Sequence, residues 1–162
     1  MSDKVDIEMR WEPLVDRHLI DRLEGAAHRL HAPVRREVAM EMNGPCECST
    51  SYYYNLFRDE DRVRLYYRGM HALQPDGTTQ QTANLAESTD GIHFTRPNLG
   101  AVEVNGSTDN NVVWFDHGAH NFSVFRDRNP ACDPEQRYKA VGSGTDSDDI
   151  QRLYGFSSPD GV

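Results

Sequence analysis

Polar side chains with acid–base or hydrogen-bonding chemistry stand at or just before the starts of three predicted strands. Glu47 precedes an aromatic strand, and a carboxyl group that is buried there has a raised pKa and can act as acid, base or nucleophile. Each candidate also has a purely structural interpretation, because these residue types favour loops. Glu47 is then a solvated glutamate, His120 and Asn121 are polar loop residues, and Asn110 is a turn residue. The candidate site residues are Glu47, His120, Asn121 and Asn110.

Three cysteines, Cys46, Cys48 and Cys132, raise the question of a metal site or a disulfide framework. An odd count without dense spacing does not indicate a disulfide framework. Cys46 and Cys48 form a C-x-C pair, which lacks the second ligand pair of a zinc site, and His117 with His120 lacks a third ligand. We therefore expect no metal and no cofactor, and we interpret Cys46 and Cys48 as small strand residues.

The composition is that of an acidic globular chain. Its 162 residues allow one domain of ordinary size, and seven Tyr, six Phe and two Trp argue against disorder. A net charge of −9 repels phosphate backbones, so we expect no nucleic-acid partner. No apolar run approaches the roughly 20 residues of a membrane helix, and no secretory signal is recognisable. We expect no membrane partner and, by default, a cytoplasmic location, while the oligomeric state stays open.

Extended segments dominate the predicted structure. One helical pattern occurs, at residues 12–30, and Gly25 and Pro33 limit it to a short helical turn in a leading segment, residues 1–33. From residue 34 to 162, alternating, aromatic and β-branched runs between turn residues predict strands. The expected strands lie at residues 36–42, 51–57, 62–69, 83–97, 110–115, 120–125, 137–144 and 151–158.

Two parts of the chain resemble one another. Three short patterns occur twice and in the same order, the clearest being S-x-D-G followed by Ile or Val. The pairs are 88–92 with 158–162, 57–59 with 125–127, and 64–69 with 137–142, at offsets of 158 − 88 = 70, 125 − 57 = 68 and 137 − 64 = 73. A period of this size in short strands predicts stacked β-sheet units, as in a propeller of four-stranded blades around a channel.

The second copy stops at Val162, before the strand that follows in the first copy. The chain also resembles the five-bladed β-propellers related to glycoside hydrolase families 32 and 43, in particular a bacterial glycosyl-hydrolase-like subset. The strings that carry this resemblance are PLVDRHLID, RLHAPV, LYYRG, STDGIHFTRP, NNVVW and RYKAV. The resemblance implies an all-β propeller of four-stranded antiparallel blades, five in full. Residues 34–162 are then expected to hold about two blades, the second truncated.

The resemblance also implies a carbohydrate site at the propeller centre, where two carboxylates flank a glycosidic bond. The relatives have a nucleophile or base before the first strand, where this chain has Glu47, and an Asp in an R-D-P motif, which Asp127 matches superficially. The chain departs from that pattern, because residues 45–51 lack W-M-N-D-P and the internal repeat pairs Asp127 with Asp59 in a hairpin turn. A general acid is expected beyond Val162.

The expected function is that of a glycoside-hydrolase-like protein that acts on carbohydrate. Glu47 and Asp127 are the candidate catalytic residues. His120, Asn121 and Asn110 are the candidate substrate-binding residues, with side chains that could bond sugar hydroxyls. One alternative is a non-catalytic carbohydrate-binding propeller, which the missing Asp positions favour. Another is an interaction module, because open sheet edges invite pairing with a second chain.

Overall fold

The computed structural model divides the chain into two units, Met1–Arg36 and Glu37–Val162, whereas the sequence placed the boundary after residue 33. The structure describes residues 6–47, 51–70, 81–115, 117–145 and 148–162. The described part of the first unit has neither a helix nor a strand. Within the expected helical stretch, the N–H of Ile20 donates to the Arg17 carbonyl at 3.1 Å and closes a single turn.

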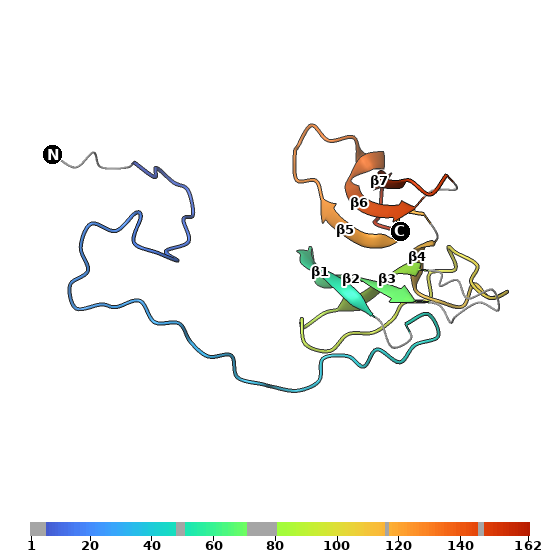
Figure 1. Cartoon of the computed structure of the whole chain (residues 1–162), viewed down its shortest axis with the longest axis horizontal. Coiled ribbons are helices and arrows are strands. Elements are labelled where there is room, and N and C mark those ends of the chain that lie inside the picture. The colour runs from blue at the N-terminus through green and yellow to red at the C-terminus, as the bar shows by residue number, and fades with distance from the viewer. Residues whose placement is uncertain (1–5, 48–50, 71–80, 116, 146–147) are drawn as a thin grey trace. The chain divides into compact units, whose positions relative to one another are not determined.

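The second unit is all-β, as expected, and its strands form two antiparallel sheets that lie as layers (Figure 1). The first sheet has the order β1-β2-β3-β4 and the second the order β5-β6-β7. Their bounds are β1 Tyr52–Asp59, β2 Arg62–Met70, β3 Gln81–Ser88, β4 Val112–Phe115, β5 His120–Arg126, β6 Tyr138–Thr145 and β7 Gln151–Ser158. A 3-10 helix, η2 (Pro134–Gln136), precedes β6. Nowhere in the described residues is there a helix with the length and apolar character to cross a membrane.

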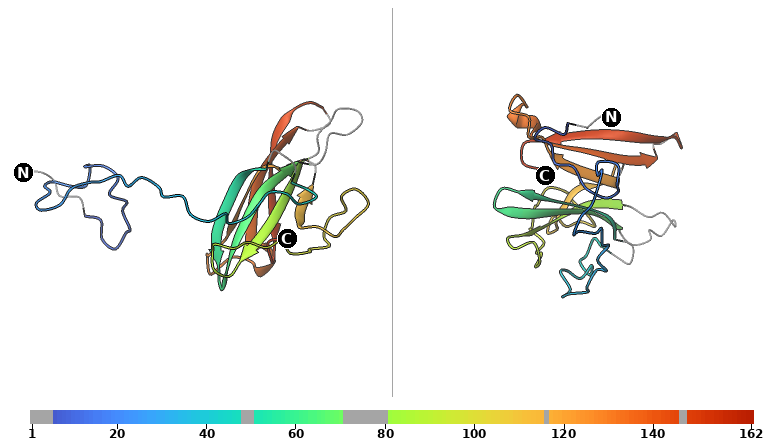
Figure 2. Two further views of the ribbon diagram at one scale, coloured as in Figure 1. Left: turned by 90° about the horizontal axis from the view of Figure 1, so that it is seen from below. Right: turned by 90° about the vertical axis from the view of Figure 1, so that its left-hand side faces the viewer.

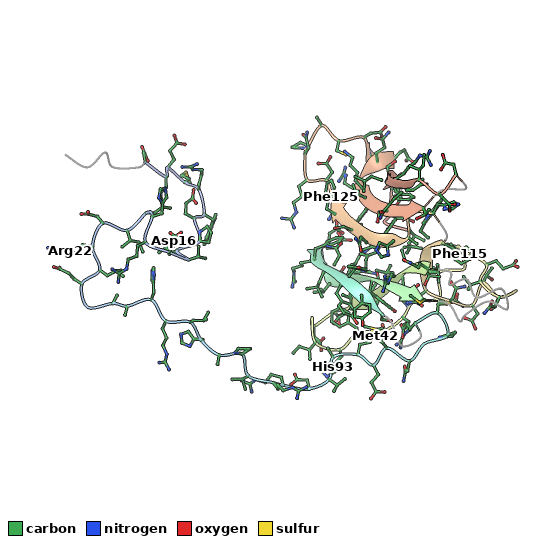
Figure 3. All side chains as sticks on the ribbon, viewed as in Figure 1. Asp16, Arg22, Met42, His93, Phe115 and Phe125 are labelled. Atoms are coloured by element: carbon green, nitrogen blue, oxygen red, sulfur yellow. The ribbon has the colours of Figure 1, made fainter. Side chains whose placement is uncertain are left out.

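Seven of the eight expected strands are confirmed among the described residues, and the prediction for residues 36–42 is wrong. That segment forms no strand, although Phe94 N–H donates to the Ala39 carbonyl at 3.4 Å. Its apolar alternation has another cause, because Met40 and Met42 pack on the first sheet; Met42 is labelled in Figure 3. The alternation of apolar residues therefore indicated correctly that the segment is extended and half-buried. It did not indicate whether the segment pairs with a strand.

The two sheets face each other across one apolar core. Two further views of the ribbon show the two sheets as facing layers (Figure 2). Consecutive strand residues point to opposite faces, so alternate side chains of each sheet reach this core. The buried residues that meet there are Tyr66, Ala83, Leu85 and Val113 from the first sheet and Phe122, Val124 and Ala140 from the second. This core fixes the positions of β1 and β5, which start at the candidate site.

Asp59 links the two sheets through a buried polar network. Its side chain is 4% exposed, and its carboxylate lies 2.9 Å from Arg64 Nε in its own sheet. From the second sheet, Arg126 Nη1 donates to it at 3.0 Å and the Tyr138 hydroxyl at 2.7 Å. A buried carboxylate needs such partners, because an unpaired charge is costly away from water.

The internal repeat of the sequence is also a repeat of local structure. The S-x-D-G turns at residues 88–91 and 158–161 follow β3 and β7. In each turn the serine hydroxyl accepts the glycine N–H, at 2.8 and 2.6 Å, and the aspartate accepts an N–H two residues on, at 2.8 and 3.1 Å. The glycines have φ of 76° and 86°, where a Cβ would be strained.

The pairing of strands corrects one detail of the repeat. Arg64 pairs with Glu87 in the first sheet, and Lys139 pairs with Ser157 in the second, where 157 − 87 = 70. Lys139, at an offset of 139 − 64 = 75, is therefore the equivalent of Arg64, and not Arg137 as the sequence suggested. The longer β5–β6 connection, which includes η2, accounts for the difference.

Candidate functional site

The strands β1 and β5 begin with matching irregularities. Their registers shift between Tyr52 and Asn55 and between His120 and Ser123. At both places a non-glycine residue has positive φ: Tyr53 at 58° and Asn121 at 54°, at an offset of 121 − 53 = 68. Bulges of this kind re-aim side chains, and strained backbone of this kind clusters at functional sites.

An aromatic and cationic cluster lies beside these bulges. The guanidinium carbon of Arg68 is 5.3 Å from the ring centroid of Tyr52 and 4.8 Å from that of Tyr53. The Tyr53 ring meets the His120 ring edge to face, with centroids 5.1 Å apart. Tyr52 and Tyr53 are about half exposed, so their rings remain open to a ligand. Cation–π contacts hold the charge over the rings and keep them in place.

The imidazole of His120 joins this cluster to β3. Its Nδ1 lies 2.8 Å from Gln81 Oε1 and 3.2 Å from Arg68 Nη1. Burial, and then the positive charge of Arg68, lower the pKa of His120, so the ring is neutral at pH 7. We call Tyr52, Tyr53, Arg68, Gln81 and His120 the bulge cluster.

Glu47 has a different environment from the one expected. It is fully buried, and four donors reach its carboxylate: Tyr67 Oη at 2.5 Å, Arg96 Nε at 2.6 Å, and Arg96 Nη2 and the Gly44 N–H at 2.7 Å each. Burial alone would raise the pKa of Glu47, but these donors and the Arg96 charge outweigh burial and lower it. Glu47 is thus an ionised carboxylate with its acceptor positions occupied.

The structure does not bring Glu47 and His120 to one site. Glu47 bonds Tyr67, while His120 contacts Arg68, and these two residues are neighbours in β2. Neighbouring strand residues point to opposite faces of a sheet. Glu47 therefore belongs to the face of the first sheet that Met40 and Met42 cover, and His120 to the face that meets the second sheet.

Asp127 lies at the other end of β5 from His120, roughly 20 Å along the strand at about 3.3 Å per residue. Lys139 Nζ donates to its carboxylate at 2.6 Å and the Asn129 N–H at 2.9 Å. The Lys139 hydrogen bond is the main reason that the pKa of Asp127 is lowered to about 2. Lys139 and Asp127 match Arg64 and Asp59 in the first sheet, so the pair repeats a structural feature.

The two candidate asparagines differ in their surroundings. Asn110 organises a loop: its Nδ2 donates to the carbonyls of Val102 and Ser107 at 2.8 and 3.1 Å, and its Oδ1 accepts the Val112 N–H at 2.9 Å. Asn121 is exposed at the start of β5, next to His120. Asn121 therefore adjoins the bulge cluster, and Asn110 fixes the chain before β4.

The described residues contain no group of three His, Cys, Asp or Glu that could hold a metal ion. Cys46 is buried, and its carbonyl accepts hydrogen bonds from Thr82 and Asn84 at 3.3 and 3.2 Å. Burial, with the nearby charge of Glu47, raises the pKa of the Cys46 thiol. Cys48 lies outside the described residues.

Sequence reasoning missed Arg68, Gln81 and Arg96. Arg68 and Gln81 reach His120 only through the strand register and the stacking of two sheets, neither of which a local pattern reveals. A usable signal existed for Arg68, because a cation in a strand next to consecutive tyrosines favours cation–π contacts. Arg96 is 96 − 47 = 49 residues from Glu47, and no local pattern links the two.

Chemically, the bulge cluster offers two half-exposed aromatic rings, with the half-buried imidazole of His120 and amide of Gln81 beside them. The guanidinium of Arg68 is buried against the two rings. Comparison with known proteins adds no relative: no family model matches the chain, and no curated protein or solved structure matches it significantly. The geometry of the cluster is therefore the basis on which its function is inferred.

Proposed function

We propose that this chain is a carbohydrate-binding module of propeller type, and that the bulge cluster with Asn121 is its binding site. The observation that carries the proposal is the pair of matched bulges, which gather Tyr53, His120 and Asn121 at the starts of two adjacent strands. Aromatic faces stack on the apolar faces of sugar rings, and imidazole and amide groups bond their hydroxyls. The buried guanidinium of Arg68 holds the two tyrosine rings in place.

A propeller is the architecture that best accounts for the repeat. Two sheets with equivalent turns and equivalent bulges, packed face to face, are what neighbouring blades would be. On this proposal β1 and β5 are inner strands, and their bulges face the central channel. Five four-stranded blades, about two of them in this chain, follow from the resemblance to the glycoside hydrolase propellers.

Binding is favoured over hydrolysis by the places of the two candidate carboxylates. Hydrolysis of a glycosidic bond needs two carboxyl groups about 5–10 Å apart in one site. Glu47 is buried against Arg96 on one face of the first sheet, and Asp127 pairs with Lys139 at the far end of β5. Among the described residues the bulge cluster has no carboxylate of its own.

Tyr53→Ala is expected to weaken carbohydrate binding at least roughly tenfold, because stacking on an aromatic ring contributes about 1–3 kcal/mol in comparable sites. The measurement is calorimetric titration of the chain with a panel of neutral oligosaccharides. Tyr54→Ala is the matched control, since Tyr54 is similarly exposed and its ring lies against Tyr67, on the other face of the first sheet. No binding across the panel, or equal losses in both variants, would overturn the proposal.

Carbohydrate affinity is expected to fall as the pH is lowered through the pKa of His120. The pKa of His120 is below its ordinary value of 6.5, so the ring gains its proton only in acid, where the new charge faces Arg68. The unfolded chain binds that proton more readily, so protonation also opposes folding as the pH falls. In His120→Gln the affinity should stay level between pH 7 and 5. A wild-type affinity that is unchanged over this range would contradict the prediction.

A further inference from the structure

The contact between the two sheets is a template for a second contact. It is made mainly by β5, whose Phe122 and Val124 pack on Tyr66, Ala83 and Leu85 of the first sheet. Because the two sheets are repeats, each face of one sheet has an equivalent face on the other. The equivalent of the occupied face of the first sheet is the outer face of the second sheet.

That outer face of the second sheet, which we call the front face, is apolar and exposed. Its residues Phe125, Val141 and Leu153 are 52%, 49% and 78% exposed; Phe125 is labelled on β5 in Figure 3. Their equivalents in the first sheet are the core residues Phe57, Tyr66 and Ala83, where 125 − 57 = 68, 141 − 66 = 75 and 153 − 83 = 70. Exposed apolar faces of this kind mark interaction sites.

A surface that fits this face exists on β1. The equivalents of Phe122 and Val124 are Tyr54 and Leu56, where 122 − 54 = 68 and 124 − 56 = 68, and they are 54% and 57% exposed. Met40, Met42 and Phe94 cover the adjoining part of that face over β2 and β3 and leave the β1 side chains open. The chain thus exposes two surfaces, the front face and β1, that are equivalent to the two surfaces in contact between its own sheets.

Charged residues at the edge of the template repeat in the same way. Arg126 donates to Asp59 at 3.0 Å across the two sheets. The equivalents are Arg58 and Asp127, where 126 − 58 = 68 and 127 − 59 = 68. Arg58 is exposed at the end of β1, and Asp127 lies beside the front face. When β1 of one molecule docks on the front face of another, these opposite charges are brought together.

We propose that the front face of the second sheet binds β1 of a second copy of this chain, head to tail. In this contact Tyr54 and Leu56 of one copy pack on Phe125, Val141 and Leu153 of the other. They pack in the same way as β5 packs on the first sheet within one chain. The interface is heterologous, so each added copy leaves one free face of each kind, and the assembly grows unless a ring of sheets closes. The proposal does not depend on carbohydrate binding.

Two variants that each block one half of the interface test this proposal. Leu153→Asp places a charge on the front face, and Leu56→Asp places one on β1. Sedimentation velocity over a wide concentration range should show growing oligomers for the wild-type chain. Each variant alone should associate at least roughly 30-fold more weakly, as for loss of a central apolar contact. Mixed in equal amounts, they should form heterodimers, because the mixture contains one intact face of each kind.

The outcomes separate this arrangement from its alternatives. Ile150→Asp, at an exposed position before β7, is the control and should associate as the wild type does. Circular dichroism of every variant checks that the fold is kept. A wild-type chain that remains monomeric at millimolar concentration overturns the proposal, as would variants whose mixture stays monomeric. Self-association of Leu56→Asp alone would also overturn it, since that result means that two front faces meet symmetrically.

Discussion

Replacing Glu47 with Gln is expected to lower the free energy of unfolding by about 3–5 kcal/mol at pH 7. The change removes the charge that Arg96 binds with two nitrogens, and it leaves a guanidinium that is only 28% exposed without its negatively charged partner. The Tyr67 hydroxyl, which donates to Glu47 and accepts from Asn111, loses a charged acceptor at the same time. Urea unfolding followed by circular dichroism measures the effect.

The loss should depend on pH in a defined direction. The pKa of Glu47 is lower in the folded chain than its ordinary value of 4.5, so ionisation stabilises the fold above that pH. This contribution is lost as the pH falls through the folded-state pKa. The difference between wild type and Glu47→Gln is therefore largest near neutrality and narrows in acid.

Two further variants make the Glu47 test specific. Glu103→Gln is the matched control, because Glu103 is exposed, and its free energy of unfolding should stay within about 0.5 kcal/mol of wild type. Arg96→Gln combined with Glu47→Gln should cost less than the sum of the single changes, because neither group is then left buried and unpaired. Additive losses, or a stable Glu47→Gln chain, would contradict the buried ion pair.

Replacing Asp59 with Ala is expected to cost about 3 kcal/mol, for a reason that involves both sheets. Arg64, Arg126 and Tyr138 all meet this carboxylate, and Arg64 is only 13% exposed. Removing the carboxylate takes the acceptor from the Tyr138 hydroxyl and a buried negative charge from the two arginines, which keep Glu87 and Glu60 as partners. Arg126 and Tyr138 lie in the second sheet, so the variant should also weaken the contact between the two sheets. Thermal unfolding and hydrogen exchange of the β5 amides would detect the two effects.

Asp61→Ala is the control for Asp59, since Asp61 stands two residues further on and is 80% exposed in its ion pair with Arg62. Pairs so exposed contribute about 0–1 kcal/mol. We expect a small change in unfolding free energy and no change in exchange of the β5 amides. Equal effects of the two alanine substitutions would show that Asp59 does not join the sheets.

Much of the fold follows from local sequence patterns. Seven strands were predicted because aromatic and β-branched runs alternate with short polar turns, and the S-x-D-G turns marked the repeat. The segment at 36–42 was misjudged because Met40 and Met42 alternate as a strand does, yet face the sheet without joining its hydrogen bonds. Pairing depends on partners distant in sequence, which alternation does not specify.

The candidate site was less accessible to sequence reasoning. The internal repeat placed His120 and Asn121 at a strand start, where the structure has them beside a bulge. Glu47 was chosen from its position before a strand, but its environment is set by Arg96 and Tyr67, which the fold brings from elsewhere. Whether a carboxylate can bind a ligand or has its acceptor positions already occupied depends on such distant partners. This is why the structure shifts the proposal from catalysis towards binding.

The most direct test of the proposed carbohydrate site is an NMR titration that follows the aromatic resonances of the chain. With the oligosaccharide that binds most tightly, saturation of the sugar protons should transfer to the ring protons of Tyr52, Tyr53 and His120. The rings of Trp114 and Phe125, which lie outside the bulge cluster, should be unaffected. Transfer confined to residues away from the bulge cluster would contradict the account.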